Sequence, residues 1–261
     1  MKLNSANINI MIKACRKASR TLIRDFGEIE NLQVSLKGPG DFVTASDKKV
    51  EKILIEELQK ARPDYSIISE EAGHIKNDES FKWIIDPIDG TANFLHGIPH
   101  FATSVGLEKE GEIVCGIIYD PIKDEMFVAE KGNGSYLNNQ RMRVSKRSKL
   151  KDCIIFTGGP KSDSKNKELS LKEYNNFSSK VLTPIRKLGS ASLDMAYVAA
   201  GRCDGFWQRD LNYWDIAAGI ILVKESGGFV TDFNGEKEYV QNKTILVTNS
   251  KINNEMIELL K

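Results

Sequence analysis

The sequence predicts a mixed fold with an α+β half over residues 1–150 and an α/β half over residues 151–261. Near the N-terminus, apolar residues recur at the spacing of amphipathic helices. Short β-type runs broken by Gly, Asn and Pro then fill residues 101–144, the pattern of an antiparallel meander. After residue 150, β-type runs alternate with helical segments, as in α/β proteins. Because no Gly/Ser-rich linker separates the halves, we expect one compact structural unit with a functional site between them.

Two amphipathic helices are expected before the first buried strand. Apolar residues recur every three or four positions from Ile8 to Phe26, and Gly27 follows at the end of this stripe. A second helix is expected to begin at Ser46 or Asp47, either of which is a good N-cap, and to end before Pro63.

Carboxylates stand where two buried strands are expected to end. The strand 65–68 leads into Glu70 and Glu71, and the strand 83–85 leads into Asp86. Functional residues are often carried where a rigid element passes into a loop. These acids are therefore candidates for a binding or catalytic site.

The segment 86–94, DPIDGTANF, is the most informative stretch of the chain. Pro87 cannot donate a hydrogen bond to a neighbouring strand, so the regular ladder must be interrupted there. A turn through Ile88 brings Asp86 and Asp89 together, with the Ile88 carbonyl facing the same space. Three oxygen ligands then come from four consecutive residues.

This arrangement indicates a hard cation beside an anion site. Two carboxylates brought close together repel, so a proton or a cation must lie between them. Oxygen ligands without His or Cys at metal spacing favour Mg²⁺ over zinc. Gly90 and Thr91 are expected to open a helix, whose first N–H groups form a natural seat for phosphate.

The second half is expected to alternate strands and helices. Five strands are predicted, at residues 153–156, around Ile185, at 205–208, around Phe229 and at 245–247. Four helices are predicted, one ending near Lys180, one over 190–200, one over 214–225 and one at the C-terminus.

Composition excludes several classes of protein. The chain has 37 basic and 36 acidic residues, so its net charge of +1 gives no general attraction to nucleic acid or to an anionic membrane. The longest apolar run, 216–223, falls far short of the ~20 residues of a membrane span. The N-terminus lacks the features of a signal peptide, and the 4 cysteines are scattered, which favours buried thiols in a reducing cytosol. We therefore expect a cytoplasmic protein without membrane contact.

Three blocks of the sequence carry a resemblance to a known family. They are Glu70-Glu71, the segment 86–94 in the pattern D-P-[IL]-D-G-T-x-N-F, and the segment 214–219, WDIAAG, in the pattern W-D-x-A-x-G. With 37–47 (KGPGDFVTASD) and 225–228 (ESGG), they span nearly the whole chain. In this order they resemble the inositol monophosphatase family of Mg²⁺-dependent, Li⁺-sensitive phosphatases. The resemblance implies a layered αβαβα sandwich of the inositol monophosphatase/fructose-1,6-bisphosphatase type.

The resemblance also implies two to three Mg²⁺ ions in the active site. Glu70, Asp86 and the Ile88 carbonyl would hold one ion. Asp86, Asp89 and Asp215 would hold a second. A third, more weakly bound ion would be held by Glu70 through bridging water molecules.

The resemblance implies a catalytic role for a small group of residues. Thr91, linked to Asp47, would help Glu70 orient and deprotonate the attacking water, and no covalent phosphoenzyme is implied. The backbone N–H groups of Gly90 and Thr91 would bind the phosphate. For both Asp47 and Asp215, a helix-capping role alone stays open.

The alcohol half of the substrate is less well determined by the resemblance. It would be held by Asp89, by Gly189-Ser190-Ala191 and by the position of Gln208, where the family carries an acid. The Gln208 amide can still bond sugar hydroxyls, although it lacks the charge of a carboxylate. The motif ending in Ala92-Asn93-Phe94 favours the inositol-1-monophosphatase branch. Inositol 1-phosphate is the expected substrate, and histidinol phosphate, fructose bisphosphate and a nucleotide 3′-phosphate stay open as alternatives.

A binding function is the alternative from another class. Bacterial relatives of the family also serve in transcription, so contact with RNA or RNA polymerase stays open. The candidate surface is a basic cluster of Arg141, Arg143, Lys146, Arg147, Lys149 and Lys151. Such a run is usually a solvated edge, and it lacks the interleaved aromatic residues of single-strand binders. Assembly as a homodimer is expected from the family alone.

Overall fold

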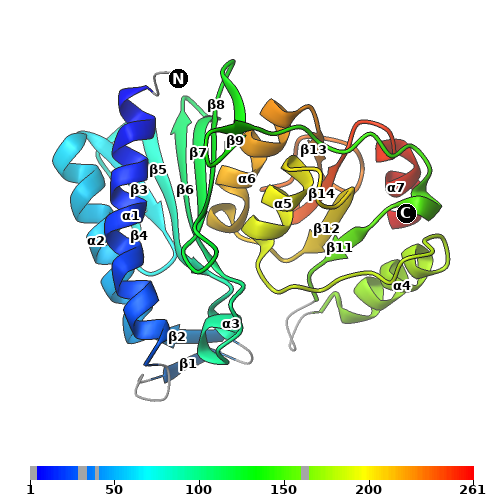
Figure 1. Ribbon diagram of the computed structural model, residues 1–261, viewed down its shortest axis with the longest axis horizontal. Coiled ribbons are helices and arrows are strands. Elements are labelled where there is room, and N and C mark those ends of the chain that lie inside the picture. Colours follow the sequence, from blue (N-terminus) through cyan, green and yellow to red (C-terminus); the bar gives the residue numbers. More distant parts are fainter. Residues whose placement is uncertain (1–4, 29–33, 39–40, 160–164) are drawn as a thin grey trace.

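The computed structural model describes residues 5–28, 34–38, 41–159 and 165–261, and for 34–38 and 41–44 only the backbone (Figure 1). The side chain of Lys37, residues 39–40 of the block 37–47 and the start of the polar loop after residue 160 lie outside this description. Among the described residues, no helix combines the length and the apolar character that crossing a membrane requires. All four cysteines lie in the described part of the chain as buried free thiols, as expected.

A large mixed sheet forms the centre of the first half. In the described residues it has eight strands: β3 (Tyr65–Ser69), β4 (Gly73–Ile75), β5 (Asp78–Asp89), β6 (Ala102–Lys109), β7 (Glu112–Asp120), β8 (Glu125–Glu130), β9 (Gly134–Leu137) and β10 (Gln140–Arg141). Their order is β10-β9-β8-β7-β6-β5-β3-β4. Only the β3–β5 pair is parallel among these described strands. The predicted antiparallel meander over 101–144 is confirmed.

Two long helices, α1 (Ala6–Phe26) and α2 (Ala45–Ala61), cover the outer face of this sheet (Figure 1). The Ser5 side chain accepts a hydrogen bond from the Ile8 N–H and caps α1, and Gly27 ends it as predicted. The apolar stripes of both helices are buried against the sheet. A hairpin of β1 (Val34–Gly38) and β2 (Asp41–Thr44), which the sequence did not predict, lies between them in the chain.

Helices α5 (Ala191–Ala199) and α6 (Tyr213–Ser226) lie between this sheet and a second one (Figure 1). The apolar run predicted as a buried helix, 216–223, is the core of α6. Gly116 on β7 allows α6 to approach the sheet, because a Cβ added there would lie 2.7 Å from the Ala218 carbonyl oxygen. Helix α6 is thus shared between the two halves of the chain.

The second sheet consists of four described strands: β11 (Ile155–Thr157), β12 (Gly205–Arg209), β13 (Phe229–Thr231) and β14 (Thr244–Thr248). Their order is β11-β12-β14-β13. Helices α4 (Lys167–Ser178) and α7 (Asn253–Leu260) lie on its outer side, which completes the predicted αβαβα sandwich (Figure 1).

The strand predicted around Ile185 is wrong. The chain makes only an isolated bridge there, between Phe156 and Arg186. Arg186 donates to the Ile155 carbonyl and accepts from the Thr157 N–H. Pro184 has no N–H and cannot extend the ladder, so the pairing stays at a single residue.

Candidate active site

A cavity of about 250 Å³ opens where the two halves of the chain meet. Its wall includes most of the residues predicted for the site: Glu70, Asp86, Ile88, Asp89, Gly90, Thr91, Gly189, Ala191, Gln208 and Asp215. Other wall residues were not predicted: Ala92, Gly158, Gly159, Leu211 and Asn212. The cavity therefore gathers segments that are far apart in the sequence, as expected for a site between the halves.

The end of β5 brings its two aspartates to this cavity through an interruption in strand pairing. Asp86 pairs with Ser104, but Asp89 pairs with Ala102, so the register shifts across Pro87 and Ile88. The Pro87 carbonyl accepts a hydrogen bond of 2.9 Å from the Thr103 hydroxyl. The two aspartates and Ile88 consequently line the same cavity, as the position of the proline predicted.

Gly90 makes the turn from β5 into the short helix α3 (Thr91–Leu95). Its φ of 96° lies in the left-handed region, and a Cβ would lie 3.1 Å from the His100 carbonyl oxygen. Only glycine fits this conformation and this close approach. Gly90 and Thr91 both line the cavity at the start of a helix, where N–H groups have no acceptor within the helix.

The Thr91 hydroxyl lies between two possible acceptors. It is 2.8 Å from the Ile88 carbonyl oxygen and 3.5 Å from Asp47 Oδ2. Since a hydroxyl has one proton, the shorter contact is the hydrogen bond, and the contact with Asp47 is at the outer limit. Asp47 is buried on α2, and the described lining of the cavity does not include it. Its predicted catalytic role stays a prediction.

Asp86 is a strongly perturbed acid of the cavity wall. It is 2% exposed, and its Oδ1 is buried without a hydrogen-bond partner among the described residues. Burial raises the pKa of Asp86 well above its usual range, and the nearby charges of Glu70, Asp89, Asp215 and Asp47 raise it further. A neutralising proton or cation is therefore strongly favoured at this carboxylate.

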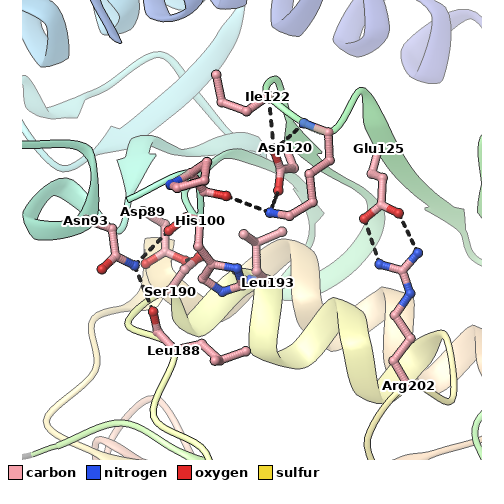
Figure 2. A network of polar contacts seen from close by, with 12 residues as sticks. Asp89, Asn93, His100, Asp120, Ile122, Glu125, Leu188, Ser190, Leu193 and Arg202 are labelled. Carbon is pink, nitrogen blue, oxygen red and sulfur yellow. Dashed lines mark hydrogen bonds and ion pairs between the residues drawn. The ribbon is translucent and has the colours of Figure 1, made fainter. Parts of the chain in front are cut away.

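Asp89 connects the first half of the chain to the start of α5 (Figure 2). Its Oδ2 accepts hydrogen bonds of 2.6 Å from each of the Ser190 and Ser192 hydroxyls and of 2.7 Å from the Ser192 N–H. Burial raises the pKa of Asp89, and these hydrogen bonds oppose that rise. Ser190 is thus buried behind Asp89, whereas Gly189 and Ala191 line the cavity. Ser192 was missed, although it directly follows the predicted segment 189–191.

Asn93 is a second connection that sequence reasoning missed, because it served there only to distinguish branches of the family. Its amide Nδ2 donates at 2.7 Å to each of the His100 and Leu188 carbonyls (Figure 2). Gly189 packs closely against it, since a Cβ there would lie 3.0 Å from Asn93 Nδ2. The amide therefore holds the predicted substrate-binding segment against α3.

Asp215 caps a helix and also lines the cavity. Its Oδ2 accepts a 2.7 Å hydrogen bond from the Asn212 N–H, and Asn212 completes a reciprocal capping box at the start of α6. Capping, the alternative left open by the sequence, is therefore present. It does not exclude metal binding, because the same carboxylate is part of the cavity wall.

Gln208 on β12 lies on the cavity wall directly beside Gly158. A Cβ at Gly158 would lie 1.9 Å from Gln208 Oε1, so the glycine makes room for the amide. Asp210, two residues further along, accepts a 2.9 Å hydrogen bond from Asn166 and is not part of the described cavity lining. It does not replace the carboxylate that Gln208 lacks.

The residues present fit a divalent, oxygen-seeking cation. The donor set consists of carboxylates and one backbone carbonyl, and the buried Asp86 Oδ1 has no hydrogen bond to lose. In the described part of the chain, no group of three or more Asp, Glu, His or Cys residues lies close enough together to hold a metal ion as it stands. The acids surround a common cavity instead, where a cation would relieve their mutual repulsion.

The His100 ring packs edge-on against Tyr197, with ring centroids 5.8 Å apart. Burial, and next the charge of Lys123, lower the pKa of His100 to about 4, while Asp120 acts in the opposite direction. Lys123 Nζ is held nearby by the Pro99 carbonyl at 2.8 Å. The folded protein thus keeps this ring neutral.

We expect His100 to reduce stability in mild acid. An unfolded histidine has a pKa near 6.5, so the contribution of the neutral ring is complete above that pH and is lost as pH falls towards 4. For this half-buried ring the loss should be on the order of 1–2 kcal/mol. Urea unfolding between these pH values should show a smaller loss for His100→Gln than for the wild type. The exposed His96→Gln serves as the control and should follow the wild type; identical profiles for all three proteins would contradict the prediction.

Comparisons with known proteins agree with this geometry. The model of the inositol monophosphatase family matches residues 4–261. An inositol-1-monophosphatase of Mesorhizobium japonicum is 48% identical over 258 residues, covering 98% of this chain and 97% of the relative. The Nus factor SuhB of Pseudomonas aeruginosa is 40% identical over 250 residues, covering 94% and 92%.

Solved structures show the same similarity. The extragenic suppressor protein suhB of Bartonella henselae has a TM-score of 0.95 at 50% identity, covering 98% of this chain and 99% of that chain. An inositol monophosphatase from Anabaena has a TM-score of 0.86 at 32% identity, covering 97% and 94%. Because the matches cover 97–98% of this chain, the likeness extends over both sheets. The chain therefore belongs to the inositol monophosphatase family.

Proposed function

We propose that this protein is a phosphoric monoester hydrolase that converts inositol 1-phosphate to inositol and phosphate. The observation that carries the proposal is the buried Asp86, which lies among other acids beside the helix start at Gly90-Thr91. Such a wall suits a cation next to a phosphate. Relatives of similar length named inositol-1-monophosphatase support the choice of substrate.

The ligands we propose for two to three Mg²⁺ ions are Glu70, Asp86, the Ile88 carbonyl, Asp89 and Asp215. Bound Mg²⁺ supplies a Lewis acid that activates water and neutralises phosphate charge. Glu70, supported by Thr91 and Asp47, takes the proton from the attacking water. The Gly90 and Thr91 N–H groups hold the phosphate oxygens while the alcohol departs in line with the attack.

Recognition of the alcohol is proposed for the opposite wall of the cavity. Gly189 and Ala191 give their backbones to that wall, and Gln208 offers an amide to the ring hydroxyls. Asp89, itself a proposed metal ligand, accepts a 3.3 Å hydrogen bond from the Ala191 N–H of this wall. Ser190 contributes to recognition through Asp89, to which its hydroxyl donates.

A panel of phosphate esters tests this proposal directly. Phosphate release with Mg²⁺ should be measured for inositol 1-phosphate, histidinol phosphate, fructose bisphosphate and a nucleotide 3′-phosphate. We expect the highest kcat/KM for inositol 1-phosphate. If it is among the poorest substrates, the inositol assignment is wrong, although hydrolysis of another ester would leave the phosphatase assignment intact. The same assay should show inhibition by Li⁺, as the family resemblance implies.

Gln208→Glu is expected to lower KM for inositol 1-phosphate. Hydrogen bonds from hydroxyls to a carboxylate exceed those to an amide by about 1 kcal/mol, which corresponds to about a 5-fold change. The control substrate is p-nitrophenyl phosphate, which has no ring hydroxyls and whose KM should not change. An equal decrease for both esters would place the effect at the phosphate and contradict recognition of the alcohol by Gln208.

Assembly as a homodimer, which the family resemblance implies, and residence in the cytoplasm, which the scattered buried cysteines favour, complete the proposal. Sedimentation velocity at micromolar concentration tests the first, and fractionation of the source cells tests the second. A protein that stays monomeric throughout would contradict the proposed dimer.

Contact with RNA or RNA polymerase is a second candidate function, favoured by relatives of 37–40% identity that are named Nus factor SuhB. The basic cluster is only partly available for this role. Arg147 pairs with the buried Asp204 at 3.1 Å, so its guanidinium has a structural partner. Contact with RNA or RNA polymerase would therefore be made by the other basic residues of the cluster.

A further inference from the structure

Glu70 differs from the other proposed metal ligands in the element that carries it. Asp86, Ile88 and Asp89 belong to β5, and Asp215 belongs to the first turn of α6. Glu70 instead follows β3 in the turn that leads into β4, just after the last strand pair, Ser69 with Gly73. Turns of this kind move more readily than the elements they connect, so Glu70 requires an anchor of its own.

The anchor is Glu51, a buried carboxylate on α2 that is 5% exposed. Its Oε1 accepts a hydrogen bond from the Ser69 hydroxyl and another, of 3.0 Å, from the Glu71 N–H. These donors belong to the residues immediately before and after Glu70. One carboxylate oxygen therefore holds both chain neighbours of Glu70 against α2.

Helix α2 also carries Asp47, which lies beside Thr91 of the proposed catalytic group. Asp47 precedes Glu51 by one helical turn, and residues four apart lie on the same face of a helix. Asp47 lies 3.5 Å from the Thr91 hydroxyl, while Glu51 holds the turn of Glu70. The helix is packed into the core of the first half through its apolar stripe, which includes the fully buried Val50. The spacing between the turn of Glu70 and Thr91 is consequently set by one rigid element.

The chemistry of Glu51 is unfavourable for stability alone. Burying a carboxylate costs free energy unless hydrogen bonds compensate for the lost water, and an apolar residue at the same place would avoid the cost. Among the described residues, Glu51 accepts its hydrogen bonds from Ser69 and Glu71, the two chain neighbours of Glu70. The contact therefore holds Glu70 in a defined position.

We propose that Glu51 is a positioning residue that fixes Glu70 for metal binding and proton transfer, acting through the Ser69 hydroxyl and the Glu71 N–H. This inference rests on the proposed function. Residues that orient metal ligands typically change metal affinity or activity by about 10- to 100-fold when they are removed.

Four variants test the proposal: Glu51→Ala, Glu51→Gln, Ser69→Ala and Glu56→Gln. Glu51→Ala should lower kcat by about 10- to 100-fold, with little change in KM for the ester, and should raise the Mg²⁺ concentration required. Glu51→Gln keeps an acceptor oxygen for both donors and should recover most of the activity. Ser69→Ala should give an intermediate loss. Glu56 is on the same helix with its side chain 58% exposed, so Glu56→Gln should match the wild type.

A direct binding measurement separates this inference from the proposed function. Mn²⁺ affinity, followed by electron paramagnetic resonance without any ester, should weaken in Glu51→Ala and recover in Glu51→Gln. If the wild type hydrolyses no phosphate ester, the proposed function fails, but this affinity pattern still supports the anchor. Unchanged Mn²⁺ affinity and kcat in Glu51→Ala, with only a lower Tm, would overturn the inference. If Glu51→Ala does not fold, the same decision rests on Ser69→Ala, whose unchanged affinity and kcat would overturn it.

Discussion

Asp86→Asn is expected to abolish phosphate release while raising the stability of the protein in the absence of divalent cations. Asp86 is almost fully buried, and burial and the surrounding acids raise its pKa. The amide keeps the shape of the side chain but removes the charge that repels Glu70, Asp89 and Asp215. Loss of cation binding should lower kcat by at least about 10³-fold. Relief of the buried repulsion should add about 1–3 kcal/mol to the free energy of unfolding.

Asp204→Asn is the matched control, because Asp204 is also buried but its carboxylate accepts hydrogen bonds from neighbouring groups. It accepts hydrogen bonds from the Ile154 N–H at 2.7 Å and from Arg147 at 3.1 Å. We expect this variant to be destabilised and to keep its activity per folded molecule. Thermal unfolding with EDTA and with Mg²⁺ makes the comparison, and Mg²⁺ should raise Tm for the wild type but not for Asp86→Asn. If Asp86→Asn is destabilised like Asp204→Asn, Asp86 is a structural residue.

The same variant distinguishes the two candidate functions. Asp86→Asn removes hydrolysis but leaves the exposed surface of the protein unchanged, because the side chain is buried. In cells that depend on this protein, failure of Asp86→Asn to replace the wild type assigns the cellular role to catalysis. If the variant replaces the wild type fully, the cellular role is assigned to binding of RNA or RNA polymerase.

Asp215→Asn is the second substitution with a large expected effect. The carboxamide oxygen can still accept the hydrogen bond from the Asn212 N–H, so the start of α6 should be preserved. The free energy of unfolding should change by less than about 1 kcal/mol. The loss of a charged ligand should lower kcat by about 10²-fold or more and weaken Mg²⁺ binding. Isothermal titration with Mg²⁺, alongside phosphate release, measures both effects.

Ser5→Ala provides the capping control, because Ser5 caps α1 and is not part of the described cavity lining. It should cost about 1 kcal/mol of stability and leave kcat unchanged. Full activity and normal Mg²⁺ affinity in Asp215→Asn would mean that Asp215 serves α6 alone.

The helices and the meander were predictable because their signal is local. The apolar stripe from Ile8 to Phe26 and the run 216–223 report which faces become buried, whatever they pack against. Around Ile185, the same reasoning failed. A short apolar segment is compatible with a strand, but whether it finds hydrogen-bond partners depends on its neighbours, and beside Pro184 only one bridge forms.

The site shows the same division more sharply. The segment 86–94 predicted by itself that Asp86 and Asp89 line a common site, because Pro87 interrupts the strand pairing between them. It did not determine that Ser190 and Ser192 donate to Asp89 across more than a hundred positions of chain. Those partners meet only because α5 packs between the two sheets.

The local sequence patterns by themselves thus predicted the helices and strands of the two halves, the segments that carry the acids and a preference for an oxygen-seeking cation, whereas the layered sandwich was implied by the family resemblance. Their periodicity and spacing act over a few residues, and backbone sterics convert them directly into local structure. Only the tertiary structure decided that Glu51 supports the turn of Glu70 and that Gly158 makes room for Gln208. These contacts join elements distant in sequence, and their geometry depends on how whole layers pack together.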